Sequence, residues 1–302
     1  MSEDLSLLDG TITGLAVRPA EPTSKPLLVF VHGGGANARG FDVPGRSQLR
    51  RAALNGFPAF ALNRPGYGGS ASLDFAPDSE DGLFAATAER LDDAIAELWS
   101  RHAGDAPGVV VNGVSIGGAI ALHLAARWGG QAEPRWPLIG LATSDIAQVP
   151  PDDIVAAWHS SAVEERVDLF SLMDRITMPP LWTMGARLDP GALPGVFEPA
   201  VRAEVLEVVG GWTRDWAKVA ASVTVPVHHR LAEHDTFWIP SPALLADFTR
   251  ELRTRSPYVD AALFPGAGHG IADSVAGAEY PFQVLGFAER CAAAVTTPRL
   301  LG

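Results

Sequence analysis

The feature that most constrains the fold is a repeated alternation of short, continuously apolar runs with amphipathic stretches. The apolar runs have the length and composition of strands buried on both faces: 26–31, 58–62, 108–114, 137–143, 225–232 and 258–264. Most of these runs are separated by stretches with the apolar periodicity of a helix, which are 47–54, 82–102, 116–128, 242–255 and 278–295. Strands that alternate with helices predict an α/β fold with a mostly parallel sheet covered on both faces. An opening hairpin is expected over 7–17.

The alternation is interrupted once, between residues 147 and 222. No strand run is found there, and helical stretches are separated by Pro and Gly pairs such as Pro150-Pro151 and Gly210-Gly211. We therefore expect a core built from 1–146 and 223–302, with 147–222 inserted as a helical cap. Such a cap would cover the carboxyl edge of the sheet, where open α/β sheets bind ligands.

Charge excludes several classes of partner. The 302 residues carry a formal net charge of −12, and 47% are hydrophobic, as in a globular enzyme. An acidic chain without clustered Lys and Arg predicts no nucleic-acid partner and no docking on anionic lipid. No apolar run approaches the ~20 residues of a membrane span, and the N-terminus lacks a secretory pattern. We expect a cytoplasmic protein, a monomer or a homodimer.

The most informative stretch is the junction between the strand 108–114 and the helix that follows it. Gly113, Ser115 and Gly117 fit the pattern G-x-S-x-G. A nucleophile on a sharp strand-to-helix turn needs small neighbours two residues before and after it. The turn exposes the hydroxyl above the sheet and places the amide of Ile116 at a helix N-terminus, where it can stabilise an oxyanion. The alternative is that Ser115 only caps the helix.

A serine hydroxyl needs a base, and the base needs an orienting acid, in the chain order Ser, acid, His. His269 follows the last strand in a glycine-rich loop, and Asp235 follows the strand before it. Both loops open on the same edge as Ser115. His234 is the rival base. Two other acids could orient the base instead, and these rivals are Glu233 and Asp145.

Three glycines, 33–35, end the first apolar strand behind His32 and can bring the backbone close to a ligand. Residues 33–38 also fit the dinucleotide pattern G-x-G-x-x-A. That alternative requires an acid at the end of the next strand, and the residue there is Asn63. We expect no cofactor. No His, Cys or carboxylate cluster has metal-ligand spacing, so we also expect no metal.

Together these motifs resemble the α/β-hydrolase fold family. The matching segments are His32–Gly35, Asn63–Ser70, Gly113–Gly118, Glu233–Asp235 and Gly268–Gly270. The resemblance implies a central eight-stranded sheet with a helical cap, a triad of Ser115, Asp235 and His269, and an oxyanion hole from the amides of Gly34 and Ile116. The family's usual Asp before Arg-Pro-Gly is Asn63 here. The glycine turn is also similar to that of carbon–carbon bond hydrolases, although Ala36-Asn37 replaces the Pro-Gly expected there.

The predicted function is hydrolysis of an ester, thioester or lactone through an acyl-enzyme on Ser115. Carbon–carbon cleavage, or acyl transfer or cyclisation in a biosynthetic pathway, could use the same triad. A ligand-binding protein with little turnover is the alternative from another class. The expected partner is a small molecule with an apolar part, and the cap supplies candidate substrate contacts: Trp158, His159, Trp182, Trp212 and Trp216.

Overall fold

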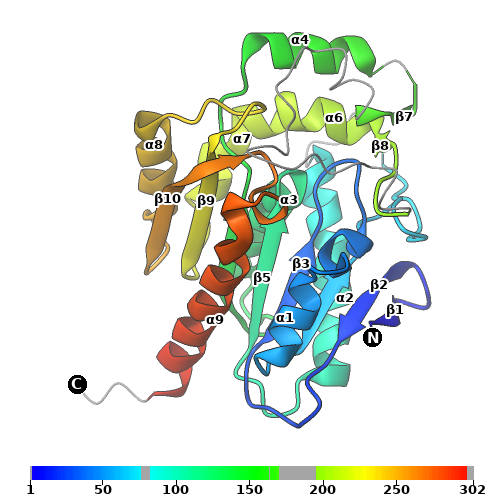
Figure 1. Ribbon diagram of the computed structural model, residues 1–302, viewed down its shortest axis with the longest axis vertical. Coiled ribbons are helices and arrows are strands. Elements are labelled where there is room, and N and C mark those ends of the chain that lie inside the picture. Colours follow the sequence, from blue (N-terminus) through cyan, green and yellow to red (C-terminus); the bar gives the residue numbers. More distant parts are fainter. Residues whose placement is uncertain (1, 76–81, 163, 170–194, 298–302) are drawn as a thin grey trace.

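A computed structural model describes residues 2–75, 82–162, 164–169 and 195–297 (Figure 1). Its centre is an eight-stranded sheet in the order β1-β2-β4-β3-β5-β6-β9-β10. The strands are β1 (Glu3–Leu7), β2 (Ile12–Val17), β3 (Leu27–Val31), β4 (Ala59–Leu62), β5 (Val109–Val114), β6 (Leu138–Ser144), β9 (Val227–His234) and β10 (Val259–Gly268). Only the β1–β2 and β2–β4 pairs are antiparallel. The predicted mostly parallel, eight-stranded sheet is confirmed.

Helices cover both faces of this sheet (Figure 1). They are α1 (Gln48–Leu54), α2 (Gly82–His102), α3 (Ile116–Gly130), α4 (Asp152–Ser161), α6 (Arg202–Val209), α7 (Gly211–Ala220), α8 (Pro242–Leu252) and α9 (Tyr280–Thr296). Helices α2, α3, α7 and α8 pack side by side on one face, whereas α1 and α9 pack on the other. Because both faces are covered, the central strands β3 and β4 are buried at every position. None of the described helices combines the length and apolar character needed to cross a membrane.

The opening hairpin begins earlier in the chain than the sequence pattern suggests. β1 starts at Glu3, and the turn lies at residues 8–11, where Leu8 and Asp9 both have positive φ. The inward-facing side chains of β1 are Leu5 and Leu7, which alternate with exposed neighbours. A strand with so few apolar residues gives a weak periodic signal, which is why the prediction included only the last residue of β1.

The described part of the segment between β6 and β9 contains helices α4, α6 and α7, and also a short two-stranded sheet that the sequence analysis did not predict. β7 (Arg166–Val167) pairs antiparallel with β8 (Ala200–Val201). Two residues per strand are too few to produce a period-two pattern. Figure 1 shows α4 and α6 above the carboxyl ends of the strands. Helix α7 instead joins the layer that contains α3 and α8.

Candidate active site

Ser115 lies on a strained turn between β5 and α3. Its backbone has φ 54° and ψ −126°, a conformation that non-glycine residues rarely adopt. The glycines on either side allow this turn. A Cβ on Gly113 would lie 2.4 Å from the carbonyl oxygen of Gly117, and a Cβ on Gly117 would lie 2.3 Å from that of His32. The G-x-S-x-G spacing thus reflects close backbone packing at this corner.

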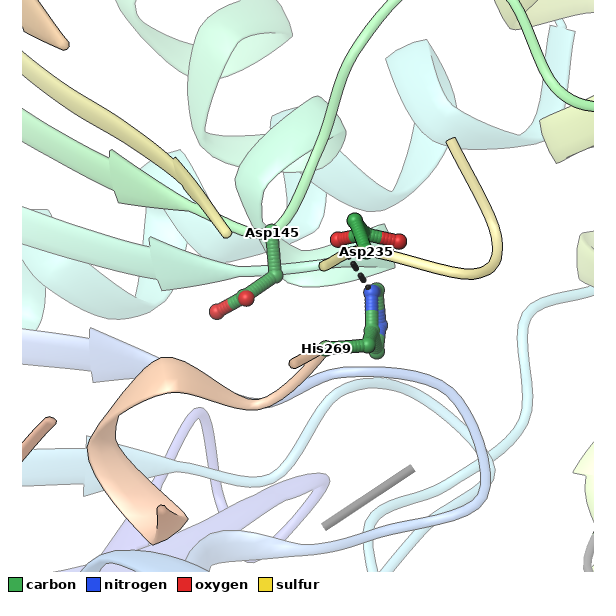
Figure 2. Close-up of side chains that lie close together, drawn as sticks. All are labelled: Asp145, Asp235 and His269. Carbon is green, nitrogen blue, oxygen red and sulfur yellow. Dashed lines mark hydrogen bonds and ion pairs between the residues drawn. The ribbon is translucent and has the colours of Figure 1, made fainter. Parts of the chain in front are cut away.

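The Ser115 hydroxyl meets an imidazole that is itself bound to a carboxylate. Ser115 Oγ lies 3.0 Å from His269 Nε2, and His269 Nδ1 lies 2.9 Å from Asp235 Oδ2. Figure 2 shows the second of these contacts. An ionised carboxylate can only accept, so Nδ1 carries the proton and donates it to Asp235. The Nε2 lone pair is then directed at the serine hydroxyl.

Two opposing effects act on the pKa of His269. Burial disfavours the imidazolium, but the charge and hydrogen bond of Asp235, with the charge of Asp145, outweigh it and raise the pKa above its ordinary value. A more basic imidazole is a better acceptor for the serine proton. It is also protonated, and therefore inactive as a base, up to a higher pH.

Asp235 is fixed at both of its oxygens. Oδ2 binds His269, while Oδ1 accepts from the main-chain N–H groups of Phe237 and Trp238, at 2.8 and 3.1 Å. The side chain has no exposed surface. These contacts leave the carboxylate one orientation, and that orientation sets the imidazole plane.

The rival residues Glu233 and His234 precede Asp235 in the chain and form other contacts. Glu233 and His234 are both exposed and lie 3.7 Å from each other, and Glu233 accepts from the main-chain N–H of Gly266. Neither forms a hydrogen bond or an ion pair with His269 or Ser115 in the part of the chain that the structure describes. The structure therefore favours Asp235 over Glu233 as the partner of His269.

Asp145, the other rival acid, lies close to the site but serves a different group (Figure 2). It is fully buried and follows β6, and its oxygens accept from the main-chain N–H groups of Gly270 and Ile271, at 3.0 to 3.3 Å. Burial, reinforced by the charge of Asp235 and opposed by that of His269, raises the pKa of Asp145 to about 6. Asp145 thus anchors the loop after His269.

Asp145, Asp235 and His269 also have potential metal-ligand atoms within 4.8 Å of one another. The hydrogen bonds already described use these atoms: His269 Nδ1 binds Asp235, and Asp145 accepts from two main-chain amides. A metal ion would have to replace those bonds. The cluster is accounted for as a hydrogen-bonded unit.

Gly34 and Ile116, the predicted oxyanion donors, both line the cavity beside Ser115. Their main-chain N–H groups have no hydrogen-bond acceptor among the described residues. Ile116 is the first residue of α3, so its N–H also lies at the positive end of a helix dipole. Two unpaired donors next to a nucleophile are suited to bind a negatively charged oxygen.

His32 and Asn63 support the glycine turn. His32 is buried, accepts from the N–H of Arg64 at Nε2, and contacts the carbonyl of Gly33 through Nδ1. Burial and the Arg64 charge hold its pKa well below the ordinary value, so it is neutral. Asn63 Oδ1 accepts from the N–H of Ala38, and its amide donates to the carbonyl of Gly68. Asn63 therefore ties two turns together and is not available for a ribose.

A cavity of about 130 Å³ opens beside Ser115, and its wall is mostly apolar. Trp158 of α4, one of the candidate substrate contacts, lines it and packs edge-on against Phe237 with ring centroids 5.6 Å apart. Phe237 in turn packs edge-on against His269, at 4.5 Å. The sequence analysis missed Phe237, although an aromatic pair two residues after the acid was the available signal.

Of the other candidate cap residues, three lie off this cavity wall and one lies outside the described residues. Trp212 and Trp216 do not line this cavity: Trp212 is fully buried and donates to the carbonyl of Ala147, and Trp216 stacks on Phe248 of α8. The reason is that α7 packs against α3 and α8. His159 is exposed and also lies off the cavity wall. Trp182 lies outside the described residues.

An eight-stranded α/β sheet with a serine elbow, a histidine and an aspartate at its carboxyl edge is the architecture of the α/β-hydrolase class. The chain belongs to the alpha/beta hydrolase family, whose model matches residues 28–281. Comparison with curated protein sequences gives no significant match.

Solved structures with the same fold are similar over almost their whole length. A lipase in its open form has 17% identity and a TM-score of 0.67, covering 97% of this chain and 99% of the other. A carboxyl esterase from Bacillus coagulans has 16% identity and a TM-score of 0.65, covering 98% and 99%. The enol-lactonase from Burkholderia xenovorans LB400 has 15% identity and a TM-score of 0.61, covering 98% and 100%. At this identity the likeness establishes the fold, and family membership supports a hydrolase.

Proposed function

We propose that this protein is a serine hydrolase that cleaves an ester, thioester or lactone through an acyl-enzyme on Ser115. The observation that carries the proposal is the continuous chain of contacts from Ser115 Oγ through His269 to Asp235, at 3.0 and 2.9 Å, on a strained elbow. Such a chain activates a hydroxyl that is otherwise a poor nucleophile.

In the first half-reaction Ser115 Oγ attacks the carbonyl carbon while its proton passes to His269 Nε2. The imidazolium that forms is stabilised by Asp235. The carbonyl oxygen becomes an oxyanion held by the N–H groups of Gly34 and Ile116. The carbon–oxygen or carbon–sulfur bond to the leaving group then breaks, and His269 returns the proton to that group.

In the second half-reaction a water molecule takes the place of the leaving group. His269 accepts a proton from this water as it attacks the acyl carbon, and a second oxyanion forms at the same two amides. The bond from Ser115 Oγ to the acyl carbon breaks and His269 returns the proton to Oγ. The products are the acid and the free enzyme.

The cavity supports a substrate with an apolar part. Trp158, Ile154 and Phe237 form an aromatic and aliphatic wall beside the nucleophile. Apolar walls with few polar groups bind by excluding water, and the polar groups set orientation. The sequence-based expectations of a cytoplasmic location, of a monomer or homodimer, and of a cap over 147–222 stay predictions.

A fluorophosphonate probe, combined with turnover of short and long acyl esters, tests the proposal. The probe should label wild-type protein at Ser115, and Ser115→Ala and His269→Ala should abolish labelling and lower ester hydrolysis by ~10⁴-fold or more. Ser100→Ala, a change at an exposed serine on α2, is the matched control and should leave both unchanged.

Folded wild-type protein that neither takes the label nor turns over any ester would contradict an activated serine and favour the ligand-binding alternative. Labelling at Ser115 without ester turnover would instead favour carbon–carbon cleavage, acyl transfer or cyclisation on the same triad.

A further inference from the structure

Two polar side chains on the wall of the apolar cavity are not used by the mechanism and have no hydrogen-bond partner among the described residues. Gln48 begins α1, and Asp273 ends the short 3-10 helix η3 (Ile271–Asp273). Both line the same cavity as Ser115. Asp273 follows the base His269 by only four residues, so this polar pair belongs to the substrate cavity.

Gln48 is 7% exposed, and its side chain makes no hydrogen bond with a described residue. Its Oε1 is fully enclosed and has no partner among those residues. Buried amide groups in folded proteins almost always have partners. Because a terminal amide turns easily about its last bond, Gln48, which lines the cavity, can present this unpaired oxygen to a ligand there.

The Asp273 carboxylate is similarly unpaired. It forms no hydrogen bond or ion pair with any described residue. Arg46 lies nearby, but its Nη1 donates to the main-chain oxygen of Asp273, at 2.7 Å, and not to the carboxylate. Burial raises the pKa of Asp273 to about 6, opposed by the charge of Arg46, so the group is mainly ionised at neutral pH.

Resting on the proposed hydrolase function, we propose that Asp273 and Gln48 form a subsite for a hydrogen-bond donor on the non-reacting part of the substrate. Carboxylate oxygens accept only, and an ionised one pairs best with a cation. The preferred substrates are therefore esters or lactones with an apolar chain that carries a primary ammonium group, with a hydroxyl as the weaker form of the same chemistry.

Esters of equal chain length that end in an ammonium, a hydroxyl or a methyl group test this subsite, with the group placed on the acyl chain in one series and on the alcohol in the other. In one of the two series wild-type protein should show a kcat/KM at least ~10-fold higher for the ammonium ester than for the methyl ester. Asp273→Asn should reduce this ratio about tenfold, and Gln48→Met should reduce it less.

Asp273→Glu, which keeps the charge, should restore part of the ratio, whereas loss of packing alone would not be rescued. Asp247→Asn, at an exposed acid on α8 that pairs with Arg250, is the matched control and should keep the wild-type ratio. A wild-type preference for the methyl ester in both series, or a ratio that survives Asp273→Asn, overturns the subsite.

Binding to Ser115→Ala separates this inference from the hydrolase proposal, because the intact esters can be titrated without turnover. Calorimetry should give a lower Kd for the ammonium ester than for the methyl ester, and the additional change Asp273→Asn should remove the difference. If wild-type protein hydrolyses no ester and this difference is found, the subsite stands and the hydrolase proposal fails. If methyl esters are hydrolysed and the difference is absent, the reverse holds.

Discussion

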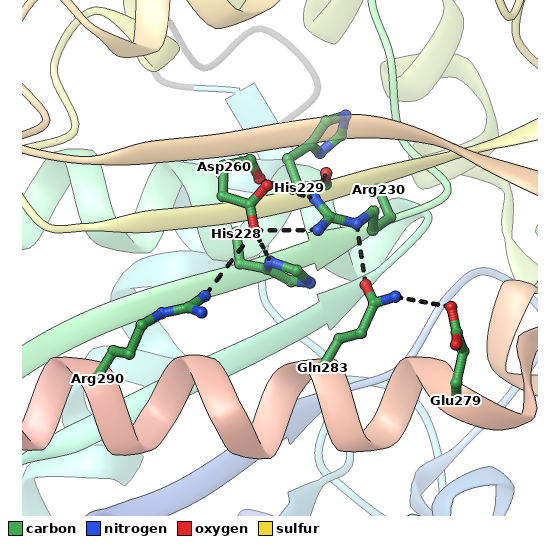
Figure 3. Close-up of polar contacts among 7 residues, drawn as sticks. All are labelled: His228, His229, Arg230, Asp260, Glu279, Gln283 and Arg290. Atoms are coloured by element: carbon green, nitrogen blue, oxygen red, sulfur yellow. Dashed lines mark hydrogen bonds and ion pairs between the residues drawn. The ribbon is translucent and has the colours of Figure 1, made fainter.

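Two histidine–aspartate pairs in the described part of the chain have the same hydrogen bond and opposite electrostatics. His269 Nδ1 lies 2.9 Å from Asp235, and His228 Nδ1 lies 3.0 Å from Asp260 (Figures 2 and 3). The pKa of His269 is raised, whereas burial and the charge of Arg230, opposed by Asp260, lower the pKa of His228 to about 4. The contact alone therefore does not make a basic imidazole.

The difference lies first in what else binds the carboxylate. Asp260 is shared with Arg230 and is approached by Arg290, as Figure 3 shows, so its charge is already neutralised. Among the described residues Asp235 pairs with His269 as its only charged partner, and its second oxygen meets main-chain amides. A carboxylate without a competing cation transfers its full stabilisation to the imidazolium.

The second difference is what the other ring nitrogen meets. His269 Nε2 faces the Ser115 hydroxyl, but His228 Nε2 is buried without a partner among the described residues, and its ring stacks on Phe287 at 5.6 Å. One imidazole has a proton to accept and the other has only packing contacts. We infer that a histidine–aspartate pair can serve as a general base only where its carboxylate is not shared with a cation and its other ring nitrogen meets a nucleophile.

Replacing each acid by its amide should produce the largest difference between the two histidine–aspartate pairs. Asp235→Asn should lower kcat/KM for a reactive ester by ~10³–10⁴-fold, because the amide cannot stabilise the imidazolium and can impose the wrong tautomer. Asp260→Asn should leave kcat/KM within about threefold, since Asp260 lies outside the site. Equal losses in the two variants would show that the two pairs are not functionally distinct.

We expect His228 to affect the stability of the protein at acid pH and not its turnover of esters. Its pKa falls from an ordinary value near 6.5 to about 4 on folding, so the unfolded chain binds more protons in this window. The free energy of unfolding therefore falls as pH decreases from about 6.5 to 4, by up to ~3 kcal/mol for this residue.

His228→Gln should remove that part of the pH dependence and leave esterase activity intact. Urea titrations at several pH values measure it, and His234→Gln, at an exposed histidine, is the matched control. An acid slope as steep as that of wild type would refute a buried neutral His228.

Replacing Asp145 should have the smallest effect of these changes, and the effect should appear in the pH profile of kcat/KM. Its charge contributes to the raised pKa of His269, so Asp145→Asn should lower that pKa and move the acid limb of the kcat/KM profile to lower pH. The plateau should change by less than roughly tenfold, because the amide oxygen still accepts from Gly270. Glu233→Gln, at an exposed acid in the same corner, should not move the limb. A limb that moves to higher pH in Asp145→Asn would rule out a stabilising charge at this position.

Local chemistry made the serine elbow and the central strands predictable. Gly113 and Gly117 flank Ser115 because any Cβ there meets backbone atoms, and this restriction leaves a readable spacing in the sequence. Apolar runs marked the central strands because burial on both faces requires continuous hydrophobicity. Short or half-exposed strands, such as β1 and β7, leave no such signal.

The fold class and the serine elbow could be predicted from the sequence alone, since each depends on patterns within single strands, helices and turns. The choice between the two acids beside His269 required the folded chain, because β6 and β9 are adjacent and bring Asp145 and Asp235 to the same edge. The tertiary structure also placed Trp212 and Trp216 in helix packing, and Gln48 and Asp273 on the wall of one cavity. Those contacts join residues far apart in sequence, and no local pattern encodes the distance between them.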